Sequence, residues 1–415
     1  MQLSKYSIGV GDRFGMQARA QLSAIIEARS LALCVVPVWN KSNREHSIIG
    51  TGPLEQRRAV EEAIRDFAFT GEYHVDADHI NMNNVEQFIE ACDFFTLDVA
   101  DFSGKAAEPQ AIRDFLQRHQ DLIGRRLDIE GVEGGLCASS EEAEAIAGKY
   151  LLAVQEAGRL YRHIAAQKGE GNFIAEVSMD ETDLAQTPLD MLFILAAIAD
   201  EGIPAQTIAP KFTGRFNKGV EYVGDLPQFE KEFNQDLAVI RYAVKKFDLP
   251  KNLKLSIHSG SDKFAIYPIM RAAIRKYDTG LHLKTAGTSW LEELIGMASV
   301  GADGLEMAQY IYAQAYERFD ELCKPYATVI DIDTDKLPTP AEVNSWTAQQ
   351  YCDALIHEQS NPAYNPNFRQ MLHVAFKVAA ELGENYLDMV NRYAAEIGEN
   401  VCYNIFERHI KRIFC

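Results

Sequence analysis

Short apolar runs alternate with longer stretches of helical pattern over the first three quarters of the chain. Runs rich in branched and aromatic residues, bounded by turn residues, are typical of buried parallel strands. Eight such runs predict strands at residues 31–38, 73–78, 94–98, 172–178, 206–210, 253–258, 280–284 and 303–306. Because most intervals between them have a helical pattern, the chain is predicted to be an α/β protein, a (β/α)8 TIM-type barrel rather than an open sheet.

Helix signals lie between these strands. One long helical stretch covers residues 141–167. Thr187 followed by Pro188 is a capping residue with proline in the first turn, which predicts a helix start. A second predicted helix begins at Leu226-Pro227 and runs to residue 246.

The last quarter of the chain has a different pattern. From residue 307 onward most positions are helical in character, and residues 369–384 and 386–396 carry apolar residues at helical spacing. The pattern predicts a catalytic barrel over residues 1–306 and a mainly helical C-terminal extension over residues 307–415. This extension is expected to pack on the barrel or on a partner subunit, so a homo-oligomer is left open.

Charge and hydropathy narrow the range of partners. The 415 residues include 60 acidic and 41 basic side chains, a net charge of −19, with no basic stripe that would attract phosphates. The longest apolar run, residues 191–199, is about half of the ~20 residues that a membrane span needs, and the start lacks the apolar core of a signal peptide. We therefore expect a cytoplasmic protein that binds a small molecule, with no nucleic acid and no membrane.

Histidines fall where a barrel enzyme places its chemistry, at the carboxyl ends of strands. His79, His258 and His282 each follow or end a predicted strand, beside acids or lysines. Imidazoles from separate strands, alone or with a carboxylate, suit Zn2+ or Mn2+ and leave a position for substrate. The pattern predicts one divalent metal cation, although any one of these histidines taken alone is more often a hydrogen-bonded core or loop residue.

Carboxylates and lysines accompany them. Asp78 and Glu176 belong to different predicted strands, so they are candidates for a base and an acid on either side of a substrate. The alternatives are metal ligation or an ion pair with Lys211. Lys211, Lys263 and Lys284 are candidates to neutralise an acidic substrate or an oxyanion, and a Schiff-base role for one of them stays open.

Two further residues complete the candidate substrate site. Arg13 is our candidate for binding a substrate carboxylate, because a guanidinium binds carboxylates with two parallel hydrogen bonds. An ion pair with Asp12 or another acid is the alternative. Asp262 follows His258 in the same strand-end loop and is placed with the substrate-binding candidates.

Several segments resemble one known family. Residues 6–15, 76–80, 257–264, 281–290 and 367–377 are similar to the tagaturonate epimerase family, and together they extend over nearly the whole chain. The block His-Ser-Gly-Ser-Asp-Lys-Phe that begins at His258 is the most specific of them. The resemblance implies a bacterial isomerase of hexuronate catabolism that interconverts the sugar acids D-tagaturonate and D-fructuronate with a divalent metal.

The resemblance also implies residue roles. By motif, His79, His258 and His282 would be the metal ligands, Asp78 the proton acceptor and Glu176 the proton donor. The two uronates differ at a carbon β to the ketone, whose C–H is not acidified, so simple enolisation cannot invert it. Retro-aldol cleavage, rotation of the aldehyde and reclosure would do so, with direct acid–base inversion as the other route.

Other functions fit some of the same residues. A divalent-metal-dependent aldolase, or an epimerase of a related keto sugar or sugar acid, would use the same ligands. A sugar-acid binding protein without catalysis would keep the arginine and lysine contacts but need neither the metal nor the acid pair. The identity of the metal and the use of neutral ketohexoses stay open, since His and carboxylate ligands accept several metals.

Overall fold

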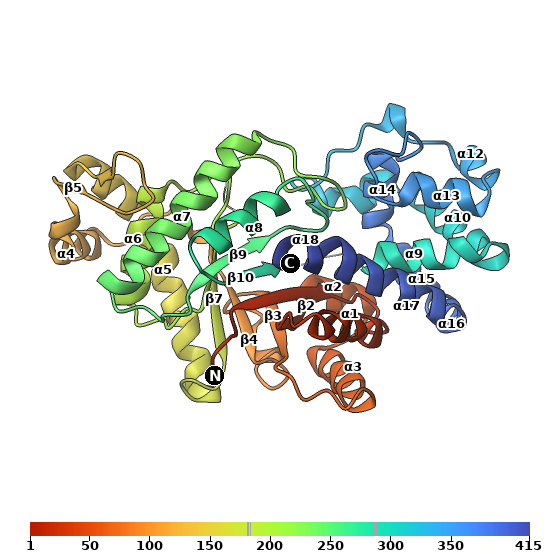
Figure 1. Ribbon diagram of the computed structural model, residues 1–415, viewed down its shortest axis with the longest axis horizontal. Coiled ribbons are helices and arrows are strands. Elements are labelled where there is room, and N and C mark those ends of the chain that lie inside the picture. Colours follow the sequence, from red (N-terminus) through yellow and green to blue (C-terminus); the bar gives the residue numbers. More distant parts are fainter. Residues whose placement is uncertain (181, 183, 285–288) are drawn as a thin grey trace.

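Eight parallel strands close into a barrel in the computed structural model, which describes residues 1–415 except 181, 183 and 285–288 (Figure 1). Around the barrel the strand order is β1, β10, β9, β8, β7, β4, β3, β2. The strands are β1 Tyr6–Gly11, β2 Val35–Ser42, β3 His74–Ile80, β4 Phe94–Asp98, β7 Ile174–Ser178, β8 Thr207–Ala209, β9 Lys254–His258 and β10 Leu281–Lys284. A separate antiparallel pair joins β5 Arg126–Leu127 to β6 Leu136–Cys137. The predicted (β/α)8 barrel is confirmed.

One strand prediction is wrong. Residues 303–306 lie in the first turns of helix α10 (Ala302–Glu317), and the remaining barrel strand is β1 near the N-terminus. Two glycines and Ser7 interrupt the apolar pattern of β1, so its sequence does not look like a buried strand. The stretch at 303–306 continues instead into buried positions at helical spacing, which include Ala308, Ile311 and Ala315. The other seven predictions coincide with strands, although the run at 31–38 is displaced to Val35–Ser42.

Helices cover the outside of the barrel. They are α1 Ala18–Ser30, α2 Asn43–Ile49, α3 Pro53–Asp66, α4 Pro109–Arg118, α5 Ser140–Lys168, α6 Pro188–Asp200, α7 Leu226–Lys246, α8 Tyr267–Lys276 and α9 Ser289–Val300. The three helices predicted between strands are confirmed as α5, α6 and α7. Thr187 caps α6, since its hydroxyl accepts a hydrogen bond of 3.1 Å from the main-chain N–H of Asp190.

The C-terminal part of the chain is helical, as predicted. Its helices are α10, α11 Phe319–Cys323, α12 Pro340–Asn344, α13 Ala348–Leu355, α14 Pro366–Val374, α15 Phe376–Leu382, α16 Glu384–Arg392, α17 Ala394–Tyr403 and α18 Lys411–Phe414, with a π-helical stretch at Asn404–Ile410. The chain returns to the barrel at its end, where α17 packs on α1 and α9 and α18 packs on α8 (Figure 1). The domain boundary at 306/307 falls within α10, and the division into 1–306 and 307–415 stays a prediction.

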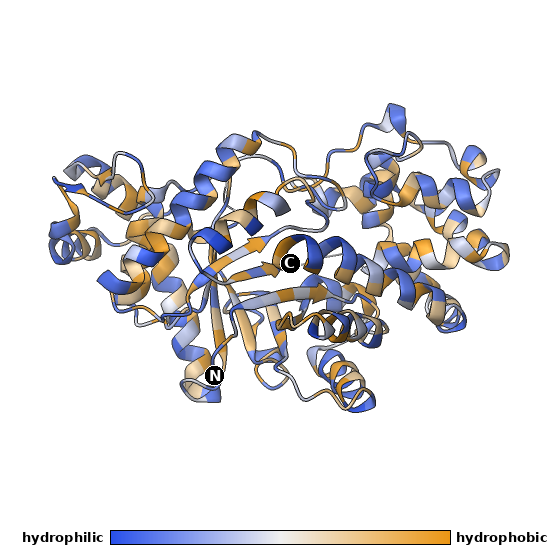
Figure 2. Ribbon diagram, in the orientation of Figure 1, coloured by the Kyte–Doolittle hydropathy of each residue, from blue (hydrophilic) through white to orange (hydrophobic). Residues whose placement is uncertain are grey.

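The barrel interior changes from apolar to polar along the strands. Leu3, Val36, Val38, Phe94 and Ile174 form a small apolar cluster separate from the main core. On β2 the same alternating row continues from Val36 and Val38 to Asn40, so the side chains become polar toward the carboxyl end. The outer helices carry both apolar and polar residues (Figure 2). None of the helices in the described residues combines the length and apolar character that crossing a bilayer requires.

Candidate active site

A cavity of about 780 Å3 opens where the barrel strands end. Its walls come from loops after several strands and from the C-terminal region; they include Arg13, Asn40, Asp78, His79, Asp180, Lys211, Lys218, His258 and His373. Side chains from many parts of the sequence therefore meet at the carboxyl end of the barrel, where (β/α)8 enzymes hold their substrates.

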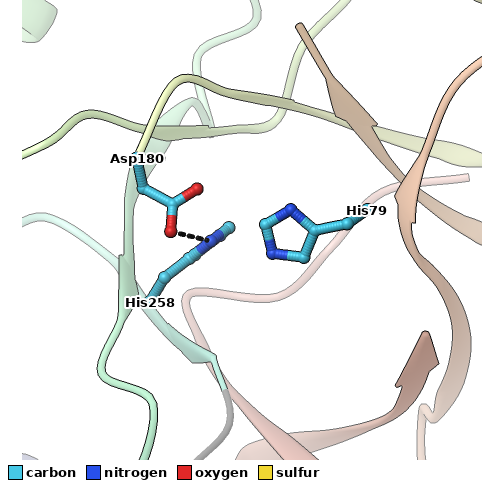
Figure 3. A group of neighbouring side chains, drawn as sticks. All are labelled: His79, Asp180 and His258. Carbon is cyan, nitrogen blue, oxygen red and sulfur yellow. Dashed lines mark ion pairs between the residues drawn. The ribbon is translucent and has the colours of Figure 1, made fainter. Parts of the chain in front are cut away.

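His79, Asp180 and His258 converge on one point of this cavity (Figure 3). Their donor atoms all lie within 4.8 Å of one another, and Nδ1 of His258 is 3.0 Å from a carboxylate oxygen of Asp180. The two imidazole rings meet edge to face with their centres 5.1 Å apart. Two imidazoles and a carboxylate are a donor set that could hold a divalent cation.

An irregularity in β3 brings His79 into this group. Strict alternation would direct His79 away from the face that carries Asp78. The pairing of β3 with β4 shifts register between Ala77 and Ile80, and His79 has a φ of +52°, which non-glycine residues seldom adopt. The local irregularity turns the imidazole toward the cavity, so Asp78 and His79 both line it.

One ring nitrogen of each histidine in the group contacts a carboxylate outside the group. Nε2 of His258 lies 2.8 Å from Oε1 of Glu176, and Nδ1 of His79 lies 3.3 Å from an oxygen of Asp98. Such contacts leave the other ring nitrogen for a ligand, and they orient the ring, as outer carboxylates do around metal-binding histidines. Although burial opposes it, the charges of Lys284 and His258 hold the pKa of Glu176 well below its usual range.

Lys284 lies beneath the group and joins the buried carboxylates. Its ammonium is 2.8 Å from Asp76, 2.9 Å from Asp78 and 3.3 Å from Glu176, and it also donates to Thr96. Burial alone would lower the pKa of Lys284, but these carboxylates raise it well above its ordinary value. Lys284 therefore stays charged and does not contact the cavity, which removes it from the candidates for a Schiff base.

The two predicted acid–base residues, Asp78 and Glu176, both contact this ammonium. Asp78 lines the cavity, and Lys284 keeps its pKa below the usual value despite burial. Glu176 is completely buried and lies under His258. Asp76, next to them on β3, has its pKa raised to about 7, mainly by burial. Asp78 therefore presents an ionised carboxylate to the cavity, whereas Glu176 lies behind His258.

Carboxylates outnumber lysines at this site. Five carboxylates surround it (Asp76, Asp78, Asp98, Glu176 and Asp180), while Lys284 is the only lysine that pairs with any of them among the described residues. Buried charges are normally paired with opposite charges or metals. Although burial opposes it, the carboxylates also raise the pKa values of His79 and His258, so a divalent cation could take the place of the protons on these imidazoles.

His282, the third histidine predicted from sequence, lies elsewhere. It is 1% exposed, its Nδ1 is 2.9 Å from the hydroxyl of Ser7, and its ring packs on Phe94. His282 precedes Lys284 by two residues on β10, so it belongs to the same inward-facing row one layer deeper in the barrel. Burial lowers the pKa of His282 to about 3. Sequence analysis did not identify Asp180 as a ligand, although its place two residues after β7 was available as a signal.

The candidate substrate-binding residues divide into two groups. Arg13 and Lys211 line the cavity, as expected of substrate contacts, with Arg13 also 3.3 Å from Glu45. Asp262 and Lys263 do not: both are completely buried away from it. The carboxylate of Asp262 is 3.0 Å from Arg369, and Lys263 donates to main-chain carbonyls.

Together, the closed barrel and the polar side chains that meet at its carboxyl end define a (β/α)8-barrel enzyme. The family model described as tagaturonate epimerase matches residues 1–412. The chain belongs to the tagaturonate epimerase family, and it is therefore an isomerase. The resemblance noted in the sequence is confirmed.

Two kinds of relative agree with the family. The tagaturonate/fructuronate epimerase of Thermotoga maritima is 25% identical over 430 aligned positions, covering 98% of this chain and 79% of that protein. A glycerol complex of the fructuronate-tagaturonate epimerase UxaE from Cohnella laeviribosi superposes with a TM-score of 0.81 at 20% identity, covering 100% of this chain and 82% of that one. Its native structure gives 0.78 at 19% identity, with 100% and 82% covered. At these identities the two structures support the fold alone.

Proposed function

We propose that the protein interconverts D-tagaturonate and D-fructuronate with the help of one divalent cation held by His79, Asp180 and His258. The observation that carries the proposal is the convergence of these three donors at the cavity, with carboxylates in excess around them. Family membership supports the substrate pair. In this proposal Asp180 takes the place that sequence analysis gave to His282, whose role as a ligand stays a prediction.

The chemistry explains why such a site needs both a cation and a base. The inverted carbon is β to the ketone, so its own C–H bond is a poor acid. A bound Zn2+ or Mn2+ would supply Lewis-acid polarisation of the ketone and the hydroxyl beside it. Asp78, kept ionised by Lys284, would accept the proton of the hydroxyl on the carbon that is inverted.

Loss of that proton allows the adjacent carbon–carbon bond to break. The hydroxyl-bearing carbon becomes an aldehyde, and the bonding electrons move into the fragment that carries the ketone. After the aldehyde rotates, the same bond closes on its other face, and the new alkoxide recovers a proton, so no atom is gained or lost. Asp78 would return that proton, whereas the contacts of Glu176 support a role in orienting His258; the sequence-based role of Glu176 as proton donor stays a prediction.

The test combines metal analysis with product analysis. The purified protein is measured for bound metal by mass spectrometry and is then incubated with 13C-labelled D-tagaturonate, followed by NMR. We expect bound divalent metal and a mixture of the two uronates, both lost in His258→Ala and retained in His163→Ala, a histidine on the outer helix α5. Absence of conversion by metal-loaded wild-type protein would overturn the proposal, and accumulation of free three-carbon fragments would identify an aldolase instead.

A second experiment separates the two routes of inversion. Retro-aldol cleavage breaks a carbon–carbon bond, so deuterium at the inverted carbon should change the rate little. Direct proton removal from that carbon would give a large primary isotope effect, which would exclude retro-aldol cleavage.

A further inference from the structure

The cavity wall carries cations that differ in whether a described carboxylate pairs with them. Arg13 is 3.3 Å from Glu45, and Arg215 is 2.7 Å from Asp331. Two lysines on the cavity wall, Lys211 and Lys218, have no carboxylate partner among the residues that the structure describes. Sequence analysis selected Lys211 but not Lys218, which lies in the long segment between β8 and α7.

Lys218 lies beside the loop that follows His258. A side-chain carbon placed on Gly260 would come within 3.2 Å of Cδ and 3.4 Å of Nζ of Lys218. Gly260 is two residues beyond His258, so their α-carbons are at most about 7.6 Å apart. A six-carbon sugar acid has five carbon–carbon bonds of about 1.5 Å, a comparable length. A substrate with its ketone end at His258 can therefore extend its other end toward Lys218.

The main chain that carries Lys218 is held firmly on several sides. Lys263 donates to two carbonyls of the segment 217–220, at 3.0 and 2.7 Å, and Arg369 donates to a third at 2.6 Å. The N–H of Gly219 donates to the hydroxyl of Ser261 at 2.8 Å, and the N–H of Lys218 donates to a carbonyl at residue 329 at 2.8 Å. These bonds come from the β9 loop, from α14 and from residue 329, so the position of Lys218 is set before any ligand arrives.

The main chain of Lys218 is held in place, and its ammonium has no carboxylate partner among the described residues. This arrangement is expected of a residue that binds an anion, because ordering the site costs little free energy when the ligand binds. Arg13, the candidate from sequence, has Glu45 and His373 as neighbours, so part of its charge is already satisfied. From this contrast we infer that Lys218 binds the carboxylate of the substrate and thereby selects a uronate over the neutral ketohexose of the same configuration. The inference rests on the proposed function, since it assigns one end of that substrate.

The test is Lys218→Met, with Lys218→Arg as the charge-preserving variant and Lys251→Met as an exposed lysine control. We expect Lys218→Met to raise KM for D-tagaturonate roughly 10- to 100-fold, the range of one hydrogen bond to a charged group. Its kcat should change less than KM, and KM or the inhibition constant for the neutral ketohexose D-tagatose should stay near the wild-type value. Lys218→Arg should recover most of the affinity, and Lys251→Met should match the wild type.

Calorimetry of D-tagaturonate binding to the metal-loaded protein measures the same contact without turnover. Wild-type protein that binds the uronate but does not epimerise it counts against the proposed function and not against the contact. Lys218→Met protein that binds D-tagaturonate as tightly as wild type, or loses affinity for D-tagatose to the same extent, overturns the inference. Lys218 is partly exposed, and thermal melting of Lys218→Met and Lys218→Gln shows whether any loss comes from unfolding.

Discussion

Two clusters of charged side chains lie near the end of β9, and they differ in what surrounds them. One contains His258, the last residue of β9, and the other contains Asp262, four residues later. The open cluster consists of Asp76, Asp78, His79, Asp98, Glu176, Asp180, His258 and Lys284, and part of it faces the cavity. The closed cluster consists of Asp262, Glu292, His357, Arg369, Arg408 and His409, all at most 7% exposed. Both combine histidines, acids and basic residues, yet within the described residues only the first has members on the wall of the cavity.

The charge balance of the two clusters explains their different roles. In the closed cluster Asp262 has Arg369 at 3.0 Å, His357 at 3.2 Å and His409 at 3.3 Å, and burial raises the pKa of Glu292 to about 7. In the open cluster Lys284 pairs with three of the five carboxylates, Asp76, Asp78 and Glu176. His79 and His258 contact Asp98, Glu176 and Asp180. The closed cluster satisfies Asp262 internally, while the open cluster presents carboxylates and imidazoles to a cavity and is suited to bind a cation.

The largest expected effect comes from removing a donor of the open cluster. We expect His258→Ala and Asp180→Ala each to lose nearly all bound metal, measured by mass spectrometry, and at least ~100-fold of the epimerase activity. Glu176→Gln should weaken metal affinity by about 10- to 100-fold, since it removes an outer partner rather than a donor. If Asp180→Ala keeps its full metal content and His282→Ala loses its metal, the ligands are the three histidines implied by the sequence and not the proposed set with Asp180.

Removing the base should separate catalysis from metal binding. Asp78→Asn keeps the size of the side chain but cannot accept a proton, so we expect kcat to fall by about 10²- to 10⁴-fold. Bound metal should stay near the wild-type amount, because Asp78 is outside the group of three donors. A variant with normal kcat would show that another residue is the proton acceptor.

In the closed cluster the corresponding change should affect stability. Asp262→Asn removes the negative charge that faces Arg369, which we expect to lower the free energy of unfolding by about 3–5 kcal/mol. Denaturant unfolding measures it, with Asp278→Asn as the control, since Asp278 forms an exposed ion pair with Lys5 and should have no measurable effect. Metal content of the folded Asp262→Asn protein should be unchanged; loss of metal would mean that the two clusters are not separate.

The smallest expected effect is a change in pH dependence. Burial raises the pKa of Glu292 from 4.5 to about 7 in the folded protein. The folded state then keeps this proton where the unfolded chain releases it, so the stabilising contribution is complete below pH 4.5 and is lost as pH rises through 7. Through this one group the free energy of unfolding changes by at most about 1.4 kcal/mol per pH unit. Unfolding measured from pH 4.5 to 7 should show a shallower decline in Glu292→Gln than in wild type; equal slopes would contradict the assignment.

Much of the barrel could be predicted because its strands are buried on both sides and have continuous apolar runs. β1 was missed since glycines and Ser7 replace that pattern, and residues 303–306 were misassigned because four residues cannot distinguish a strand from the start of a helix. In the site, Asp78, His79 and His258 were selected correctly as cavity residues. The depth of His282 and the separation of Asp262 from the cavity could not be obtained from strand ends alone.

The sequence determines which residues follow each strand. Because the parallel strands of a barrel all end on the same side, these residues meet at one end of the barrel. Hydrophobic pattern, chain order and family motifs were enough to predict the barrel and to select His79, Asp78 and His258, which line the cavity at its carboxyl end. Whether a charged side chain is paired with an opposite charge depends on partners far away in the sequence. His357, Arg369 and His409, which surround Asp262, are all more than 90 positions from it. Such long-range pairing, together with the register shift that turns His79, exists only after the helices have packed on the barrel, and it separates the open cluster from the closed one.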